Sequence, residues 1–161
     1  MMNQFLLTYT AVIDTPPGRL AIRTDDSALI GLDYVDHRAP LKEPYTPMAR
    51  DVVKQLQQYF RDFRFEFELP LRLDGTAHQQ KVWQVLCNIA PGDTMTYGEL
   101  ATRIQSGARA VGNSCRRNPI SIIVPCHRVV AAAGIGGYGG QVDGKVLDRK
   151  RWLLNHEGVR A

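Results

Sequence analysis

The sequence predicts two small domains, an α/β domain over residues 1–73 and a mostly helical domain over residues 74–161. Three observations lead to this fold class. Short β-rich runs separated by turn signals fill the first 35 residues, and apolar residues at helical spacing recur in the second half. Two short helical segments there are joined by the tight turn Ser106-Gly107, which gives them helix-turn-helix dimensions.

The N-terminal domain begins with three predicted strands, over residues 5–13, 19–24 and 28–35. The turn signals Thr15-Pro16-Pro17-Gly18 and Asp25-Asp26-Ser27 separate them. Short turns between consecutive strands indicate an antiparallel meander, so we expect a small antiparallel sheet.

One helix and one further strand complete this domain. Met48, Val52 and Leu56 recur at helical spacing, which predicts a helix over residues 47–62. Phenylalanines alternate with charged residues over residues 63–67, a pattern typical of a half-buried strand. Nothing in this half indicates catalysis, so we interpret it as a scaffold.

The C-terminal domain is predicted to contain four helices, over residues 76–89, 98–104, 109–117 and 146–155. Thr76 and Gln79 have the spacing of a capping box, in which both side chains satisfy free helix donors. Cys87 lies in the first of these helices and is expected to pack in the core. The third helix is rich in small residues and ends in arginines.

Cys126 is the expected reactive residue of the chain. It follows a strand-like apolar run over residues 120–124 and is preceded by Pro125, which stiffens the backbone. A lone cysteine in such a run is more often an inert core residue. However, His127 and Arg128 follow directly, and both need polar partners. Because an adjacent imidazole is a usual means of ionising a thiol, we interpret this segment as a nucleophilic site.

Charge and cysteine content indicate partner and compartment. The net charge is +4, and residues 74–161 hold 11 Lys/Arg against 6 Asp/Glu, which favours a polyanionic partner. The three cysteines match no zinc or disulfide spacing. With no signal peptide and no membrane-spanning run in the sequence, we expect a reducing cytoplasmic setting, no membrane partner and no metal.

A glycine-rich loop covers residues 131–140 and surrounds Tyr138. It lacks the lysine spacing of a phosphate-binding P-loop. We expect a flexible wall that brings backbone N–H groups close to a flat ligand, with Tyr138 as a lid.

Residues 76–158 resemble the O6-alkylguanine-DNA alkyltransferases, also called methylated-DNA–protein-cysteine methyltransferases. The resemblance rests on five separated blocks in order: Tyr97-Gly98-Glu99-Leu100-Ala101, Ala108-Arg109-Ala110-Val111-Gly112, Arg117-Asn118-Pro119, Ile123-Val124-Pro125-Cys126-His127-Arg128-Val129-Val130 and Trp152-Leu153-Leu154-Asn155-His156-Glu157-Gly158. It implies a ribonuclease-H-like N-terminal domain and a winged-helix-like C-terminal domain. The first half carries no motif of its own.

The resemblance implies repair of DNA by transfer of an alkyl group from O6 of guanine, and from O4 of thymine, to Cys126. His127 would activate the thiol through a water, and Glu157 would orient the imidazole. Asn118 would tie the recognition helix to the active-site turn. Tyr97 would turn a backbone phosphate and protonate the departing guanine.

The resemblance also implies how DNA is held. Arg109 would fill the stack that the flipped nucleotide leaves. The other implied DNA contacts are Tyr97 and the helix residues Ala110, Gly112, Ser114 and Arg116. The implied base pocket comprises the Cys126 and Val129 carbonyls, the Gly139 amide, Tyr138 and Met95. We expect a monomer without cofactor that acts once, in the minor groove of double-stranded DNA, with little sequence preference.

Three departures from the family pattern stand out. His78 replaces a usual aromatic residue, and only a change in packing is expected from it. The segment 135–137 is about one residue short and the segment 140–150 several residues long, so the size of the accepted alkyl group and the Gly139 assignment stay open. The first half has no cysteine and only His37, so the zinc site of some relatives is not expected.

Three other functions compete with alkyl transfer. A non-catalytic alkylation-damage sensor would lack the nucleophile, which is present here as Cys126. A helix-turn-helix regulator with a sensing thiol would need a dimerisation element and a second regulatory domain, and neither is evident in the sequence. A cysteine hydrolase would need an oxyanion hole and multiple turnover.

Overall fold

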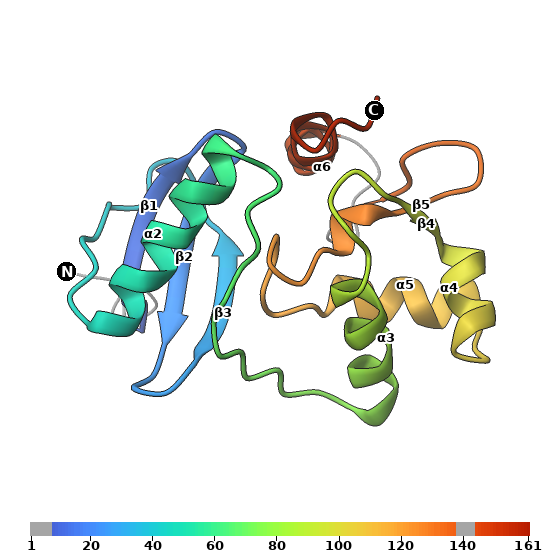
Figure 1. The fold of residues 1–161 in the computed structure, drawn as a ribbon, viewed down its shortest axis with the longest axis horizontal. Helices are drawn as coiled ribbons and strands as arrows, with labels where there is room; N and C mark the ends of the chain where they lie inside the picture. Colours follow the sequence, from blue (N-terminus) through green and yellow to red (C-terminus); the bar gives the residue numbers. More distant parts are fainter. Residues whose placement is uncertain (1–7, 138–143) are drawn as a thin grey trace. The chain divides into compact units, whose positions relative to one another are not determined.

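The computed structural model describes residues 8–137 and 144–161 (Figure 1). The chain divides into two compact units, Met1–Leu73 and Asp74–Ala161. None of the helices in the described ranges has the length and apolarity needed to span a bilayer.

The first unit contains the antiparallel meander that the sequence predicts, with strands β1 (Ala11–Thr15), β2 (Gly18–Thr24) and β3 (Leu29–Tyr34) in the order β1-β2-β3. The expected strand over residues 5–13 is displaced, and residues 5–7 lie outside the described part. The observed strand β1 starts directly after Thr10, whose amide and hydroxyl both donate to the Ile22 carbonyl. Its end is set by the two-residue loop, since Thr15 pairs with Gly18.

The central strand β2 is buried on both faces. Ala21 packs with Tyr9 and Val12 on one side. Side chains alternate along a strand, so Leu20 and Ile22, both fully buried, face the side that helix α2 covers.

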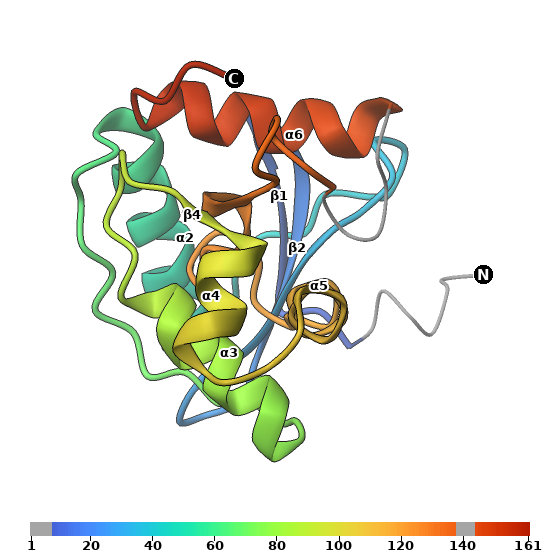
Figure 2. The same cartoon turned by 90° about the vertical axis from the view of Figure 1, so that its right-hand side faces the viewer.

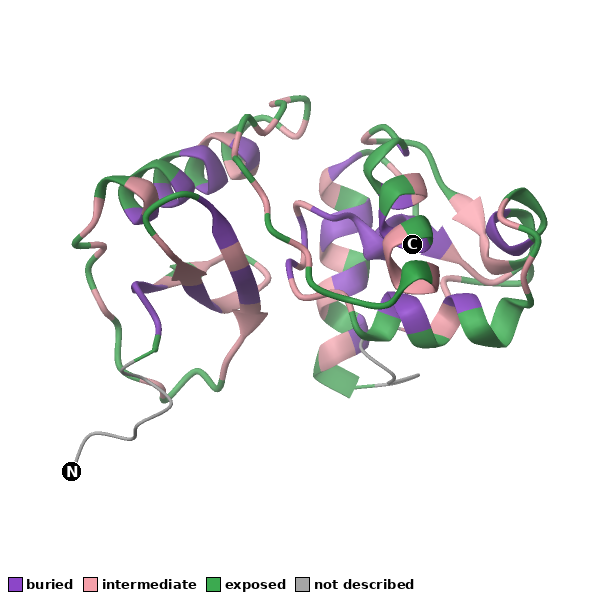
Figure 3. Cartoon of the chain, turned by 90° about the horizontal axis from the view of Figure 1, so that it is seen from below, coloured by how far each residue is buried: buried purple, intermediate pink, exposed green. Residues whose placement is uncertain are grey.

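Helix α2 (Pro47–Arg61) confirms the prediction over residues 47–62. Thr46 caps it by accepting a hydrogen bond from the Ala49 amide, and Pro47 stands at its first position, where no donor is needed. Figure 3 shows its buried positions along one side. The buried residues are Ala49, Val52, Val53, Gln55, Leu56 and Tyr59, and all but Gln55 are apolar.

The strand expected over residues 63–67 does not form. These residues follow α2 without joining the sheet, and the rings of Phe65 and Phe67 lie 5.6 Å apart. Buried Gln55 replaces a strand partner: its side chain accepts from the Glu68 amide at 2.8 Å and donates to the Glu68 carbonyl at 3.1 Å. The chain rejoins the sheet only at Leu71, which bridges Leu29.

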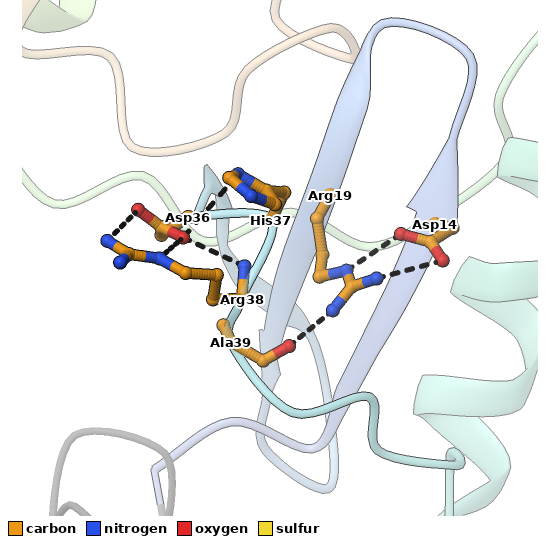
Figure 4. A network of polar contacts seen from close by, with 6 residues as sticks. All are labelled: Asp14, Arg19, Asp36, His37, Arg38 and Ala39. Carbon is orange, nitrogen blue, oxygen red and sulfur yellow. Dashed lines mark hydrogen bonds and ion pairs between the residues drawn. The ribbon is translucent and has the colours of Figure 1, made fainter.

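A polar network fastens the loop after β3 to the first hairpin (Figure 4). Arg19 forms a two-pronged ion pair with Asp14 and donates to the Ala39 carbonyl. In the loop, Asp36 accepts from the Arg38 amide and guanidinium, which holds the pKa of Asp36 well below its usual range. Such exposed pairs contribute little to stability, so the network serves mainly to shape the loop.

The second unit contains four described helices: α3 (Ala77–Cys87), α4 (Tyr97–Arg103), α5 (Ala108–Arg116) and α6 (Gly144–His156). The capping box of Thr76 and Gln79 forms as predicted, and Thr96 with Glu99 forms a second one. Strands β4 (Met95–Thr96) and β5 (Val129–Val130) make a short parallel ladder. Helix α5 packs against both α3 and α4 (Figure 2).

Two features of α3 and α5 complete this core. Trp83 is buried in α3, and its indole donates to the Ser114 carbonyl of α5 at 2.9 Å. Cys87 is exposed, so the prediction that it packs in the core is wrong. It lies one residue beyond buried Leu86, which turns its side chain about 100° away from the buried stripe.

The connection between α4 and α5 is short, as a helix-turn-helix requires. Gln105 adopts a left-handed conformation (φ 56°), and the Ser106 amide donates to the Ala101 carbonyl. Gly107 precedes α5 without any side-chain cap. The winged-helix comparison stays a prediction.

Gln55→Ala should lower the free energy of unfolding by about 1–3 kcal/mol, because it removes the two hydrogen bonds that the buried Gln55 side chain makes with the Glu68 amide and carbonyl. Urea unfolding followed by circular dichroism measures this. The matched control is Gln57→Ala at an exposed position of the same helix, where about 0.5 kcal/mol or less is expected. Equal losses in both variants would show that the Gln55 contact contributes nothing specific.

Candidate active site around Cys126

A tight turn, and not the strand-like run expected over residues 120–124, delivers Cys126. Ile122 has a left-handed backbone (φ 74°), which is rare for a β-branched residue, and its side chain is buried. The Asn118 side chain closes the turn: it donates to the Val124 carbonyl at 2.7 Å and accepts from the Ile120 amide at 3.0 Å. These two backbone groups therefore need no hydrogen bond to a neighbouring strand, because the Asn118 side chain provides their partners.

Cys126 begins the short 3-10 helix η1 (Cys126–Arg128) directly after Pro125. Its residue surface is 8% exposed, so the thiol is nearly enclosed. Burial raises the pKa of the Cys126 thiol, while the Asn118 side chain and the charge of Lys150 act in the opposite direction. Such a thiol needs an assisting base before it can act as a nucleophile.

Glu157 gathers the two side chains that follow the cysteine. One of its carboxylate oxygens lies 3.0 Å from Nε2 of His127, and both oxygens accept from the Arg128 guanidinium at 2.8 and 2.9 Å. Arg128 also donates to the Ile89 carbonyl at 2.6 Å. Burial acts to raise the pKa of Glu157, but the hydrogen bonds from Arg128 and His127 outweigh it and hold this pKa well below its usual range. Glu157 is therefore a carboxylate at neutral pH.

The carboxylate fixes the protonation pattern of His127. An ionised carboxylate only accepts hydrogen bonds, so Nε2 carries the hydrogen and Nδ1 presents a lone pair. Nδ1 is buried and has no hydrogen-bond partner among the described residues. Burial lowers the pKa of His127 against the opposing effect of Glu157, so the ring is neutral and can accept a proton.

Lys150 carries a buried ammonium group that connects strand β5 with the segment around Gly137. Its Nζ donates to the Val129 carbonyl at 2.7 Å and to the Gly137 carbonyl at 2.8 Å. It also lies 5.8 Å from the centre of the Tyr97 ring. Burial lowers the pKa of Lys150 to about 8, and the two thiols Cys126 and Cys115 act against this shift. At neutral pH the lysine therefore remains mostly charged, and its charge acts on Cys126.

Tyr97 and two of the predicted base-pocket residues, Met95 and Val129, lie in or next to the short parallel ladder of β4 and β5. The Tyr97 hydroxyl donates to the Gly137 carbonyl at 3.2 Å, and burial raises the pKa of Tyr97. Met95 pairs with Val129 across the parallel ladder, so these two predicted pocket residues are neighbours. Tyr138 and Gly139 lie outside the described residues.

Helix α5 presents most of the predicted contact residues to solvent. Arg109, Ala110 and Arg116 are exposed, and Gly112 is partly exposed. Ser114 is different, because it is 3% exposed, its hydroxyl bonds to His78 and its carbonyl accepts from Trp83. Ser114 therefore has partners within the protein, and its role as a DNA contact stays a prediction.

Both units match one family. Residues 77–159 match the 6-O-methylguanine DNA methyltransferase, DNA binding domain, and residues 8–73 match the 6-O-methylguanine DNA methyltransferase, ribonuclease-like domain. The chain belongs to this family.

Proteins that are similar over more than nine-tenths of both chains support the assignment. A methylated-DNA–protein-cysteine methyltransferase of Mycobacterium tuberculosis is 42% identical, with 92% of each chain covered, and a constitutive one of Bacillus subtilis is 35% identical, with 95% and 97% covered. The crystal structure of Mycobacterium tuberculosis OGT in complex with DNA is 40% identical and has a TM-score of 0.77, with 93% of this chain and 94% of that chain covered. The structure of a Methanococcus jannaschii O6-methylguanine DNA methyltransferase, 23% identical with a TM-score of 0.65, shares the fold.

Sequence reasoning missed one member of this methyltransferase site. The sequence does contain a signal for Lys150. It lies three residues after Leu147 and four before Leu154, which places it on the apolar face of α6, and all three residues are buried. A lysine on the buried stripe of a helix needs specific acceptors.

The other thiol near the site is a poor competitor. Burial, and then the neighbouring Cys126, raise the pKa of Cys115 to about 12, so it stays protonated. Among the residues that the structure describes, no three His, Cys, Asp or Glu side chains come together as metal ligands.

Glu157→Gln should lower the free energy of unfolding by about 3–5 kcal/mol at neutral pH, because the buried Arg128 charge loses its counter-ion. The pKa of Glu157 is lowered in the folded state, so its stabilisation is complete above the ordinary glutamate pKa of about 4.3 and is lost as the pH falls below it. The difference between wild type and variant in urea unfolding should therefore stay constant from about pH 7 to 5.5 and shrink near pH 3.5.

The control for this experiment is Asp93→Asn, which changes an exposed carboxylate of the same unit. It should alter stability by about 0.5 kcal/mol or less. A Glu157→Gln difference that persists unchanged at pH 3.5 would contradict a contribution from the ionised carboxylate.

Proposed function

We propose that this protein repairs DNA by a single irreversible transfer of an alkyl group from O6 of guanine, and from O4 of thymine, to Sγ of Cys126. The observation that carries the proposal is the joint arrangement of an enclosed thiol and a neutral imidazole held by Glu157, in a chain of the methyltransferase family. No cofactor enters the reaction, because the alkyl acceptor is the protein itself.

The reaction begins with transfer of the thiol proton to Nδ1 of His127 through a bridging water. The thiolate attacks the alkyl carbon, the S–C bond forms, and the C–O6 bond breaks. Its electrons pass to the guanine, which takes a proton from the Tyr97 hydroxyl. The lone pair on Nδ1 and the position of Tyr97 beside Gly137 support these roles. The product thioether is a poor leaving group towards water, so each molecule acts once.

Access to O6 requires that the nucleotide leaves the duplex, at a cost of about a few kcal/mol. Exposed Arg109 on α5 supports insertion into the vacated stack, and Ala110 with Gly112 would allow the helix to approach the minor groove closely. The duplex is bound by one protein monomer with little sequence preference, since these side chains offer few contacts to base edges.

The flipped base would lie against β5, where the Val129 carbonyl would accept a hydrogen bond from the base. Lys150 supports this assignment, because it fixes the Val129 and Gly137 carbonyls relative to each other. Met95 adds an apolar wall next to Val129. Tyr138 and Gly139, which the resemblance also implies for this pocket, lie outside the described residues.

Cys126→Ala should abolish methyl transfer and leave DNA binding intact, because phosphate contacts carry most of the affinity. Intact-protein mass spectrometry after incubation with a duplex that contains one O6-methylguanine measures the transfer. Wild type should gain one methyl on the Cys126 peptide and no more. Cys87→Ala, at an exposed thiol, is the matched control and should transfer normally. Methyl gain by Cys126→Ala, or binding of the duplex by wild type without mass gain, would contradict the proposal, and the second outcome is the one expected of a damage sensor or regulator.

Arg109→Ala should reduce the rate of transfer in duplex DNA by about tenfold or more while it changes the affinity for undamaged duplex by about fivefold or less. The loss should be smaller with a single-stranded substrate, which needs no flipping from a stack. Arg103→Ala, at an exposed arginine of α4, is the control. Equal rates for Arg109→Ala and wild type in duplex DNA would rule out the insertion role.

A further inference from the structure

Arg128 belongs to the buried cluster next to Cys126, but the proposed reaction gives it no task. Its side chain is 9% exposed and binds two different segments. It donates to both carboxylate oxygens of Glu157, at 2.9 and 2.8 Å, and to the Ile89 carbonyl at 2.6 Å. These hydrogen bonds orient the carboxylate relative to η1 and to the segment after α3. Arg128 therefore determines where the hydrogen-bond acceptor of His127 lies.

His127 and Arg128 share one oxygen of Glu157. Nε2 of His127 lies 3.0 Å from Oε2, and the Arg128 guanidinium donates to the same oxygen at 2.8 Å. The other oxygen, Oε1, also accepts from Arg128, at 2.9 Å. A two-pronged contact between a guanidinium and a carboxylate is among the strongest that side chains form. Arg128 is therefore the main counter-ion of Glu157, and the imidazole adds one further hydrogen bond.

The cluster is electrically balanced when the imidazole is neutral. Glu157 carries one negative charge and Arg128 one positive charge, and both side chains are withdrawn from water. Without the guanidinium, the buried carboxylate would need another cation. His127, at 3.0 Å, can become that cation by taking up a proton. An imidazolium has no free lone pair, so it could not accept the thiol proton.

We propose that Arg128 is a positioning residue for the proposed transfer, because it neutralises Glu157 and thereby keeps His127 available as a base. The inference rests on the proposed function, since it concerns the proton that leaves Cys126. Arg128 acts only through His127 and touches no reacting atom. The pKa of His127 agrees in direction: Glu157 acts to raise it, while burial and the charge of Arg128 act to lower it, and the result lies below the usual value.

The other groups around His127 do not replace Arg128. Among the described residues, Lys150 of α6 also acts to lower the pKa of His127, but its effect is smaller than that of Arg128. Helix α3 packs against η1 as well, and its Cys87 interacts with Arg128. Burial raises the pKa of Cys87 and of the nucleophilic thiol, so both are uncharged at neutral pH. Removal of Arg128 would therefore leave Glu157 to be neutralised by the imidazole.

The test measures the rate of methyl transfer from about pH 6.5 to 8 for wild type, Arg128→Met and Arg128→Lys. Time-resolved intact-protein mass spectrometry with an excess of duplex that contains one O6-methylguanine gives the rates. For Arg128→Met, the ratio of its rate to that of wild type should fall about five- to tenfold from pH 8 to pH 6.5, since the neutral form of His127 becomes scarce. For Arg128→Lys, which keeps the positive charge, the ratio should stay constant.

The matched control is Arg160→Met, which removes an exposed arginine of the same unit. Its ratio to wild type should be close to one at every pH. A merely structural role of Arg128 would lower the rate of Arg128→Met by the same factor at every pH. A constant ratio for this variant would therefore overturn the inference.

A measurement on the wild type guards against a variant that folds poorly. Nitrogen-15 NMR of the His127 ring should show hydrogen on Nε2, a bare Nδ1 and no protonation down to about pH 6, below the ordinary histidine pKa of about 6.5. A ring that is protonated at pH 7 would overturn the inference, while one methyl gained on Cys126 would leave the proposed function standing. Absence of methyl gain in the wild type would overturn both.

Discussion

The buried contact of Glu157 with His127 and Arg128 is the interaction on which the candidate active site depends. It joins the end of α6 to η1, and through the Ile89 carbonyl it reaches the segment after α3. Removing the charge of Glu157 or of Arg128 would strand the other in a low-dielectric interior, and His127 is bonded to the same carboxylate, so the three side chains form one unit. Within that unit the carboxylate is saturated by donors, which fixes the His127 tautomer and leaves Nδ1 as the basic position.

A second constraint holds Cys126 in place. The turn before Cys126 includes Ile122 in a conformation that costs free energy for a β-branched residue. Asn118 offsets this cost with two hydrogen bonds to the turn, and burial of the apolar Ile122 side chain offsets it further. Because Asn118 lies two residues after the end of α5, the same side chain also connects the helix proposed to bind DNA with the thiol. The proposed binding helix and the proposed nucleophile are thus linked through a single amide group.

The sequence allowed the meander, α2, the capped helices and the cysteine motif to be predicted, because their signals are local: turn residues, helical spacing and caps. Its failures have non-local causes. The alternating phenylalanines before Glu68 do not form a strand, since Gln55 satisfies that backbone from another element. The apolar run before Cys126 is a turn, since Asn118 does the same there. Lys150 escaped notice because its acceptors, the Val129 and Gly137 carbonyls, are brought to it only by the fold.

The charges that the proposed reaction creates have partners before it starts. Proton transfer from Cys126 to His127 would place a thiolate near Lys150 and an imidazolium against Glu157. Burial opposes both new charges, as the raised pKa of the thiol and the lowered pKa of the imidazole show. The opposite charges already in place lower this barrier without any reorganisation at the moment of reaction. For the single transfer that we propose there is a further advantage, because a thiol that is protonated and enclosed at rest reacts little with other electrophiles.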